Sequence, residues 1–428
     1  MNFILGFINY DIASGTPALP GYPILYTVIN SINFFTHSLS TAFAVAGGIS
    51  TWLIIYYTSR ILRVTLFSLE GGLTGFLIFF NTSIWLMGNK FLPDLMALAI
   101  ALPVFYYLLV DNFKARYLYK GWFLAGLLPG VMFSYIPLIV LPAIYALVKK
   151  RRFIWSIPFL LTGILLWLVP FTIYIGPSQL WAYTEMYFNS LMLTAGTANT
   201  GPGFIEILEG IWAEGLTGYI PGRNLLAIFT SLPVIALLFF GLMITLSFGH
   251  SKPKMLIGLA SLSLFLIFSY IFRDSNNLHR HILPFLPFLM IFICYGIIYF
   301  LVNFNFMLIK VIISLFLILY VSLNTGVVSD NSKPTAIASM SKRLLKKDLS
   351  DVRIVSYPQI NQYLKDSGVE AASFEDKGAL LQEDELHNTL LLLPEGYPVP
   401  DNYSERITEK HNPMINRQWT QLTLYNYK

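Results

Sequence analysis

Long apolar runs alternate with short polar segments over the first three quarters of the chain. Each run is close to the length of about 20 residues that a helix needs to cross the hydrocarbon core of a bilayer. Charged residues stop most of the runs, as they do at the ends of membrane spans. The sequence therefore predicts an α-helical polytopic membrane protein with about ten spans. We place these spans at residues 38–59, 66–87, 94–110, 119–133, 136–149, 153–175, 224–249, 254–272, 281–302 and 306–326.

The fourth and fifth of these spans are short and meet at the sequence FSYIP, where Pro137 opposes continuation of a helix. A helix that stops inside the bilayer requires protein or a water-filled cavity to satisfy its backbone. One long kinked helix over 119–149 is the alternative, and it would change the number of spans by one.

The last hundred residues have a different pattern. Segments such as DVRIVSYPQINQYL and HNTLLLLPEGYPVP alternate polar and apolar positions, and residues 327–428 contain 12 Lys and Arg and 14 Asp and Glu. About a hundred residues are enough to fold alone. We expect a small α/β domain outside the bilayer at 327–428, after a transmembrane domain at 38–326 and an external loop with interfacial helices at 1–37.

Composition agrees with a membrane protein and excludes several classes of site. The chain is 55% hydrophobic and 12% charged, against about 25% charged in an ordinary soluble domain. Its single cysteine, Cys294, excludes an intrachain disulfide and argues against a cysteine-based metal site. No phosphate-binding Walker loop, dinucleotide fingerprint or zinc-protease motif is present. We expect no cofactor and no nucleic-acid partner.

The basic residues of the loops predict an orientation in the cell membrane. Up to residue 326, one alternating set of loops holds twelve Lys and Arg and the other holds four, so the first set is assigned to the cytoplasm. The opposite set also carries seven of the nine acidic residues of this region. Both ends of the chain are then external. An external start without a recognisable signal sequence leads us to expect one more helix upstream of Met1.

The opening segment FILGFINYDIASGTPALPGYPILY resembles the first external loop of membrane glycosyltransferases of the GT-C superfamily. These enzymes use polyprenyl-phosphate-linked sugars and are related to protein O-mannosyltransferases and to lipid A aminoarabinose transferases. Phe3, Asp11, Pro17 and the run from Pro20 to Pro23 carry the resemblance, whereas Ala18 and Leu19 replace a His-Pro pair. The resemblance implies a sugar donor on a polyprenyl phosphate, and an acceptor that is a glycan, a lipid or a protein.

Three later segments resemble the same superfamily. GNKFLPDLMALAIALP is similar to its second external loop, with Asp94 before the helix and Lys90 one turn earlier. FSYIP is similar to the break between two short helices, where this chain has Tyr135. LHRHILPFLP is similar to a late element in which a basic side chain faces the active site. The resemblance implies substrate contacts for Tyr22 and Tyr135.

The residue types also point to this chemistry without the family. Sugar transfer from a phosphate needs a base for the acceptor, and Asp11 and Asp94 are the candidates. It needs cations for the leaving phosphate. The candidates for that role are Lys90, His279, Arg280 and His281.

Each assignment has a structural alternative. Asp94 after Pro93 can cap a helix, Lys90 can anchor an interface, and Asp11 can occupy a turn. A metal site on the two histidines is a weaker alternative. The long 176–223 loop supplies Glu185 as a candidate for acceptor or headgroup binding, or it forms interfacial helices.

Two other classes of protein compete with the enzyme. A transporter or flippase for a lipid-linked or polar substrate is expected to show repeats and mid-span charges. This sequence instead has charges at span ends and no evident repeat. A simple membrane anchor for the C-terminal domain would not explain the long outer loops.

Overall fold

The computed structural model divides into two compact units, and the boundary at Thr325 falls inside helix α17 (Met307–Asn331). The structure describes residues 6–7, 10–12, 17, 21–109, 115–149, 153–193, 208, 211–212, 224–247, 252–272, 280, 282–304, 306–346, 353–370, 372–373, 389–399, 401–411 and 419–427.

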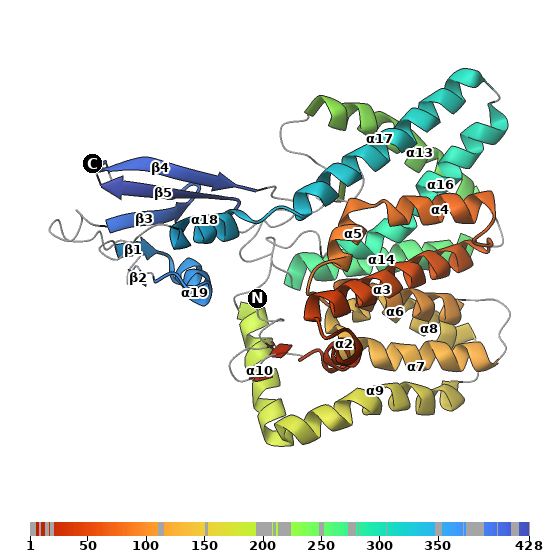
Figure 1. Cartoon of the computed structure of the whole chain (residues 1–428). Helices are drawn as coiled ribbons and strands as arrows, with labels where there is room; N and C mark the ends of the chain where they lie inside the picture. The colour runs from red at the N-terminus through yellow and green to blue at the C-terminus, as the bar shows by residue number, and fades with distance from the viewer. Residues whose placement is uncertain are drawn as a thin grey trace. The chain divides into compact units, whose positions relative to one another are not determined.

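The first unit consists of packed helices, coloured from red to cyan in Figure 1. Its helices are α2 (Pro23–Thr36), α3 (Leu39–Leu62), α4 (Leu69–Phe79), α5 (Thr82–Gly88), α6 (Asp94–Leu109), α7 (Ala115–Val131), η1 (Phe133–Tyr135), α8 (Ile136–Lys149), α9 (Phe153–Ile175), α10 (Pro177–Leu193), α13 (Asn224–Ser247), α14 (Lys252–Phe272), η4 (Leu283–Phe285), α16 (Leu286–Asn303) and α17 (Met307–Asn331). Helix α6 packs against α3, α7 and α8, and most of its side chains are buried.

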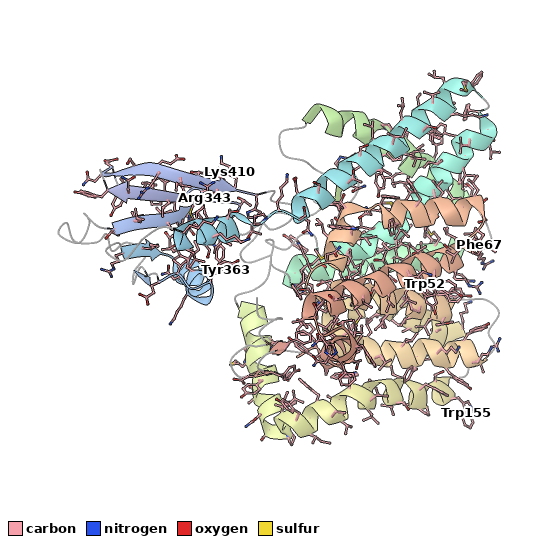
Figure 2. The ribbon with its side chains drawn as sticks, in the orientation of Figure 1. Trp52, Phe67, Trp155, Arg343, Tyr363 and Lys410 are labelled. Carbon is pink, nitrogen blue, oxygen red and sulfur yellow. The ribbon has the colours of Figure 1, made fainter. Side chains whose placement is uncertain are left out.

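Five helices of the described residues are long and apolar enough to cross a membrane, and a bent pair, α4 with α5, brings the number to six. Helices α6 and α8 and the later part of α13 are also apolar but shorter. Large exposed side chains project from the surface, among them Trp52 on α3, Phe67 in the turn before α4 and Trp155 on α9 (Figure 2). Exposed apolar surface on this scale fits a lipid environment, so the chain is a helical membrane protein.

The segment predicted as a span at 66–87 forms two helices with a bend between them. Helices α4 and α5 meet at an angle of 63° at Asn81. The Asn81 Oδ1 atom accepts hydrogen bonds from the backbone amides of Ser83 and Ile84, at 3.1 and 3.2 Å, and so caps α5. The Asn81 amide donates to the Tyr320 hydroxyl at 3.2 Å, and that hydroxyl donates to the Leu77 carbonyl at 2.9 Å. This buried network takes the place of the backbone bonds that a continuous helix would make.

The predicted interruption at Tyr135 is present. Helix α7 ends at Val131, a 3-10 turn covers Phe133–Tyr135, and α8 begins at Ile136. One continuous helix over 119–149 is therefore not formed. The predicted spans at 94–110, 153–175 and 254–272 lie within two residues of α6, α9 and α14.

Helices α7 and α9 approach closely because each presents a glycine to the other. A side chain at Gly126 would overlap the Leu160 carbonyl oxygen, and one at Gly163 would overlap the Phe123 carbonyl oxygen. Small residues at such contacts let helix backbones approach within a membrane, where packing replaces the hydrophobic effect as the source of association.

The described residues of the second unit form a five-stranded mixed sheet and two short helices. The strands are β1 (Arg353–Ser356), β2 (Ala372–Ser373), β3 (Thr389–Pro394), β4 (Tyr403–Lys410) and β5 (Gln421–Tyr427), in the order β2-β1-β3-β5-β4. β1 is parallel to both β2 and β3, whereas β5 is antiparallel to β3 and β4. Helix α18 (Ala336–Leu345) contributes Met340 to a core with Leu392 and Leu424, and α19 (Pro358–Asp366) follows β1.

We expect Asn81→Ala to destabilise the protein by about 1–3 kcal/mol, because the cap of α5 and the bond to Tyr320 are both lost in a buried setting. The measurement is reversible unfolding in detergent, compared with Asn89→Ala. Asn89 is exposed and its side chain bonds only to the Trp85 carbonyl among the described residues. Equal stability of the two variants would contradict the capping role of Asn81.

Candidate functional site

A buried ion pair joins two segments that lie far apart in the sequence. Asp94 is the first residue of α6, directly after Pro93, and its side chain is fully buried. Its Oδ2 atom accepts a hydrogen bond from Nε of Arg280 at 2.9 Å, across a sequence separation of 186 residues. Its Oδ1 atom is buried and has no hydrogen-bond partner among the described residues. The carboxylate is therefore only half satisfied by the pair.

Arg280 contacts Asp94 through Nε, and its side chain remains partly accessible. Its side chain is 20% exposed, in contrast to Asp94. Only Nε is hydrogen-bonded within the described part of the chain, so the terminal nitrogens Nη1 and Nη2 retain their N–H groups for another acceptor. Burial acts to lower the pKa of the guanidinium, but the Asp94 carboxylate and two tyrosines offset this, and the pKa lies above its ordinary value. Arg280 is thus a cation fixed by Asp94, and the described residues leave its two terminal nitrogens without a hydrogen bond.

The two tyrosines that influence Arg280 are Tyr22 and Tyr135. Tyr135 is fully buried at the end of η1, and its ring lies 5.6 Å from that of Phe265 between centroids. Tyr22 is buried directly before α2. The guanidinium therefore lies within electrostatic range of one carboxylate and two phenols, which come from three different segments.

Tyr22 has a left-handed backbone conformation, with φ of 51° after Gly21 at 79°. A bulky residue with positive φ is strained, by about 1–3 kcal/mol. Two contacts hold this turn. The Tyr10 hydroxyl donates to the Gly21 carbonyl at 2.6 Å, and the Tyr174 hydroxyl donates to the Tyr10 carbonyl at 3.3 Å. Pro23 then begins α2 with a backbone angle already suited to a helix.

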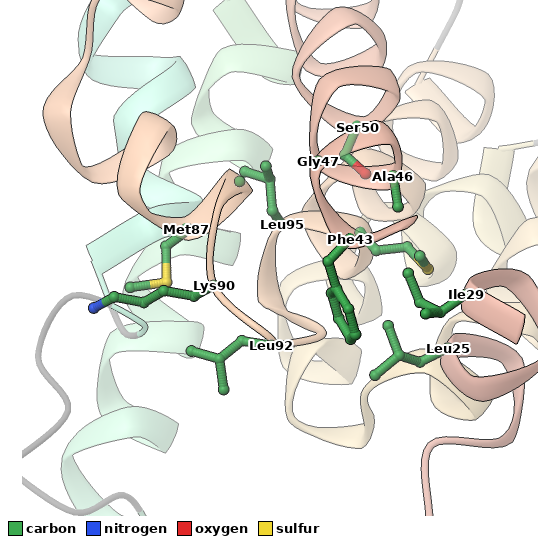
Figure 3. Close-up of a pocket in the computed structure, with 12 residues that line it drawn as sticks. Leu25, Ile29, Phe43, Ala46, Gly47, Ser50, Met87, Lys90, Leu92 and Leu95 are labelled. Atoms are coloured by element: carbon green, nitrogen blue, oxygen red, sulfur yellow. The ribbon is translucent and has the colours of Figure 1, made fainter. Parts of the chain in front are cut away.

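Lys90 lies at a small pocket beside this region (Figure 3). Its other lining is mostly apolar and includes Leu25, Phe43, Met87 and Leu92. The enclosed space holds about one water molecule, too little for a lipid chain. Lys90 is the only charged residue of this lining, so the structure places a cation against apolar surface near the start of α6.

The remaining predicted site residues are Asp11, Glu185, His279 and His281. Asp11 is half-buried in the segment before α2. Glu185 is exposed on α10, and no hydrogen bond or ion pair among the described residues joins it to Asp94 or Arg280. His279 and His281 lie outside the described residues. No group of three or more His, Cys, Asp and Glu side chains among the described residues is arranged to hold a metal ion.

Asp94, Arg280, Tyr22 and Tyr135 were all selected from the sequence, and the structure brings these four together. That Asp94 and Arg280 bind each other was not anticipated. Tyr10 and Tyr174, which hold the turn before Tyr22, were also missed. The position of Tyr10 next to Asp11, inside the opening segment, was the available signal.

No protein-family profile matches this chain, and no curated protein sequence matches it. Its structure is similar to the crystal structure of ArnT from Cupriavidus metallidurans bound to undecaprenyl phosphate, with a TM-score of 0.52 and 10% sequence identity. The likeness covers 94% of this chain and 87% of that one. At this identity the likeness is one of fold. It supports a GT-C-like fold and identifies no particular family.

We expect Asp94→Ala to lower the free energy of unfolding by about 2–3 kcal/mol, because Arg280 would keep its charge in a largely buried position. The value allows for the partial exposure of Arg280. The double variant Asp94→Ala with Arg280→Ala should be less unstable than the sum of the single variants. Denaturant titration in detergent gives the coupling energy, and Glu185→Ala serves as an exposed carboxylate control. Additive effects would show that the pair contributes no coupling.

Proposed function

We propose that this protein transfers a sugar from a polyprenyl-phosphate-linked donor to an acceptor at the external face of the membrane. The observation that carries the proposal is the Arg280 guanidinium, which Asp94 fixes at Nε and whose terminal nitrogens have no hydrogen-bond partner in the described part of the chain. A guanidinium fork matches two oxygens of a phosphate. The GT-C-like fold and the undecaprenyl phosphate bound in ArnT support a lipid of this class.

In the proposed reaction Arg280 binds the phosphate that leaves. An acceptor hydroxyl or amine attacks the anomeric carbon of the sugar and gives its proton to a base. The bond between that carbon and the phosphate oxygen breaks, and polyprenyl phosphate departs with the electron pair. Negative charge grows on the phosphate as the bond breaks, so a fixed cation stabilises the transition state more than the bound donor. Lys90 is the second cation that we assign to the donor.

The ion pair changes the role that we assign to Asp94. The Asp94 side chain is fully buried, and its Oδ2 atom already accepts a hydrogen bond from Arg280, so the carboxylate holds the guanidinium in place. We therefore assign Asp94 to positioning Arg280, and Asp11 remains the candidate base. Tyr22 and Tyr135 are assigned to contacts with the sugar or the phosphate, because both already lie within electrostatic range of Arg280. Glu185, His279 and His281 remain candidates for binding the acceptor or donor.

Arg280→Ala should weaken the binding of undecaprenyl phosphate and lower the transfer rate about ten- to a hundredfold, since a charge-assisted contact contributes about 1.5–3 kcal/mol. Arg280→Lys should recover only part, because an ammonium lacks the planar fork. Binding is measured with purified protein and undecaprenyl phosphate. Transfer is measured as release of undecaprenyl phosphate from a panel of undecaprenyl-phosphate sugars.

The matched control is Arg343→Lys, which alters an arginine that pairs with Glu409 in the second unit. A wild-type transfer rate for Arg280→Lys at low donor concentration would remove the phosphate role of Arg280. Donor binding without release of undecaprenyl phosphate by the wild-type protein would favour the flippase or transporter over the enzyme.

The proposed location of the site depends on topology. We expect reporter fusions at Arg152 and at Lys428 to report opposite sides of the membrane, with Lys428 external, because twelve basic residues mark one set of loops and four the other. The two reporters on the same side would contradict an external C-terminal domain.

A further inference from the structure

A second group of cations lies at the other end of α6 and α7 from the Asp94–Arg280 pair. Asp94 begins α6, and the tyrosines of this group lie in its last turn, about 20 Å further along the helix axis. Helix α3 ends at the same place with Arg60 in its last turn, and α7 begins there. We call this group the basic tyrosine cluster, and its members are Tyr57, Arg60, Tyr106, Tyr107, Arg116 and Tyr117.

Both arginines of the cluster are held by tyrosines rather than by carboxylates. Arg60 donates from Nη2 to the Tyr106 hydroxyl at 3.0 Å, and its guanidinium carbon lies 5.5 Å from the centre of that ring. Arg116 donates from Nη2 to the Tyr117 hydroxyl at 3.3 Å and lies 5.0 Å from that ring. The rings thus restrict both guanidinium groups, and within the described residues most of their N–H donors have no acceptor.

Contacts between the tyrosines connect the three helix ends. The hydroxyls of Tyr57 and Tyr107 are 3.0 Å apart and share a hydrogen bond. The rings of Tyr107 and Tyr117 are stacked, with 5.8 Å between centroids and an interplanar angle of 13°. The aromatic rings therefore form a continuous link between the two arginines. The positions of the arginines are fixed relative to one another by α3, α6 and α7.

The cluster has an unbalanced positive charge. Arg60, Arg116 and the neighbouring Lys120 are exposed, and none of them forms an ion pair with a described residue. The connection between α6 and α7 contains Asp111 and Lys114, so by sequence it adds no net charge. Exposed cations beside tyrosines, at the ends of apolar helices, are typical of the headgroup region of a bilayer.

We propose that the basic tyrosine cluster binds the phosphate of an anionic phospholipid at the end of α6 opposite to the Asp94–Arg280 pair. Paired N–H donors of guanidinium match the oxygens of a phosphodiester. The tyrosine contacts hold the donors in place before the lipid arrives, which reduces the ordering cost of binding. The acyl chains lie against the exposed apolar side of α3, where Trp52 stacks on Tyr56. This site is independent of the proposed sugar transfer.

The test measures lipid retained by the purified full-length protein, by native mass spectrometry after exchange into phosphatidylglycerol or phosphatidylcholine. We expect wild-type protein to retain phosphatidylglycerol over phosphatidylcholine. Arg60→Gln and Arg116→Gln should each lower retention of phosphatidylglycerol about tenfold. Lys310→Gln is the matched control, because it removes one exposed charge near the start of another apolar helix.

Two further arms distinguish a defined lipid site from general attraction between opposite charges. Tyr106→Phe and Tyr117→Phe keep every charge and remove the hydroxyls that hold the arginines. We expect about a threefold loss of phosphatidylglycerol, whereas simple attraction of an anionic membrane to positive charge predicts no loss. Millimolar inorganic phosphate should not displace the lipid. Equal retention by wild-type and arginine variants, unchanged retention by both Phe variants, or displacement by inorganic phosphate would each overturn the proposal.

Discussion

The contact on which the candidate site depends is the ion pair between Asp94 and Arg280. A carboxylate with no exposed surface is stable in its charged form only beside a cation, because its transfer out of water costs several kcal/mol. The start of α6 must therefore lie against the segment that precedes α16, although 186 residues separate them. The pair also determines which atoms remain for a ligand. Nε is occupied, the terminal nitrogens are not, and one carboxylate oxygen lacks a hydrogen bond within the described chain.

Prolines position the residues around this pair. Pro93 precedes Asp94 at the start of α6, and Pro23 follows Tyr22 at the start of α2. Pro137 lies two residues after Tyr135 at the start of α8. Proline at a first helical turn loses no backbone hydrogen bond and opposes extension toward its N-terminal side. Each interruption places a polar side chain where a helix begins.

The sequence determines these helix starts better than it determines contacts between them. The bounds predicted for α9 are those of the structure, and the interruption at Tyr135 follows locally from the nearby proline. The break at Asn81 was missed because it lies in an apolar run without a proline, and part of its support comes from Tyr320, far away in the sequence. For the same reason, residue type and segment are enough to select Asp94, Arg280, Tyr22 and Tyr135 from the sequence. The contact between Asp94 and Arg280 follows only from the folded structure.

The charges of the Asp94–Arg280 pair indicate how the proposed reaction proceeds in one direction. A polyprenyl-phosphate sugar is a phosphodiester with one negative charge, whereas the departing lipid is a monoester with a charge of about −1.5 to −2 at neutral pH. The Arg280 fork gains attraction as that charge develops, which favours the transition state. The Asp94 carboxylate, which is bound to Nε of the same guanidinium, repels the additional charge. In the proposed reaction the carboxylate therefore orients the cation for bond breaking and also limits how tightly the product is held.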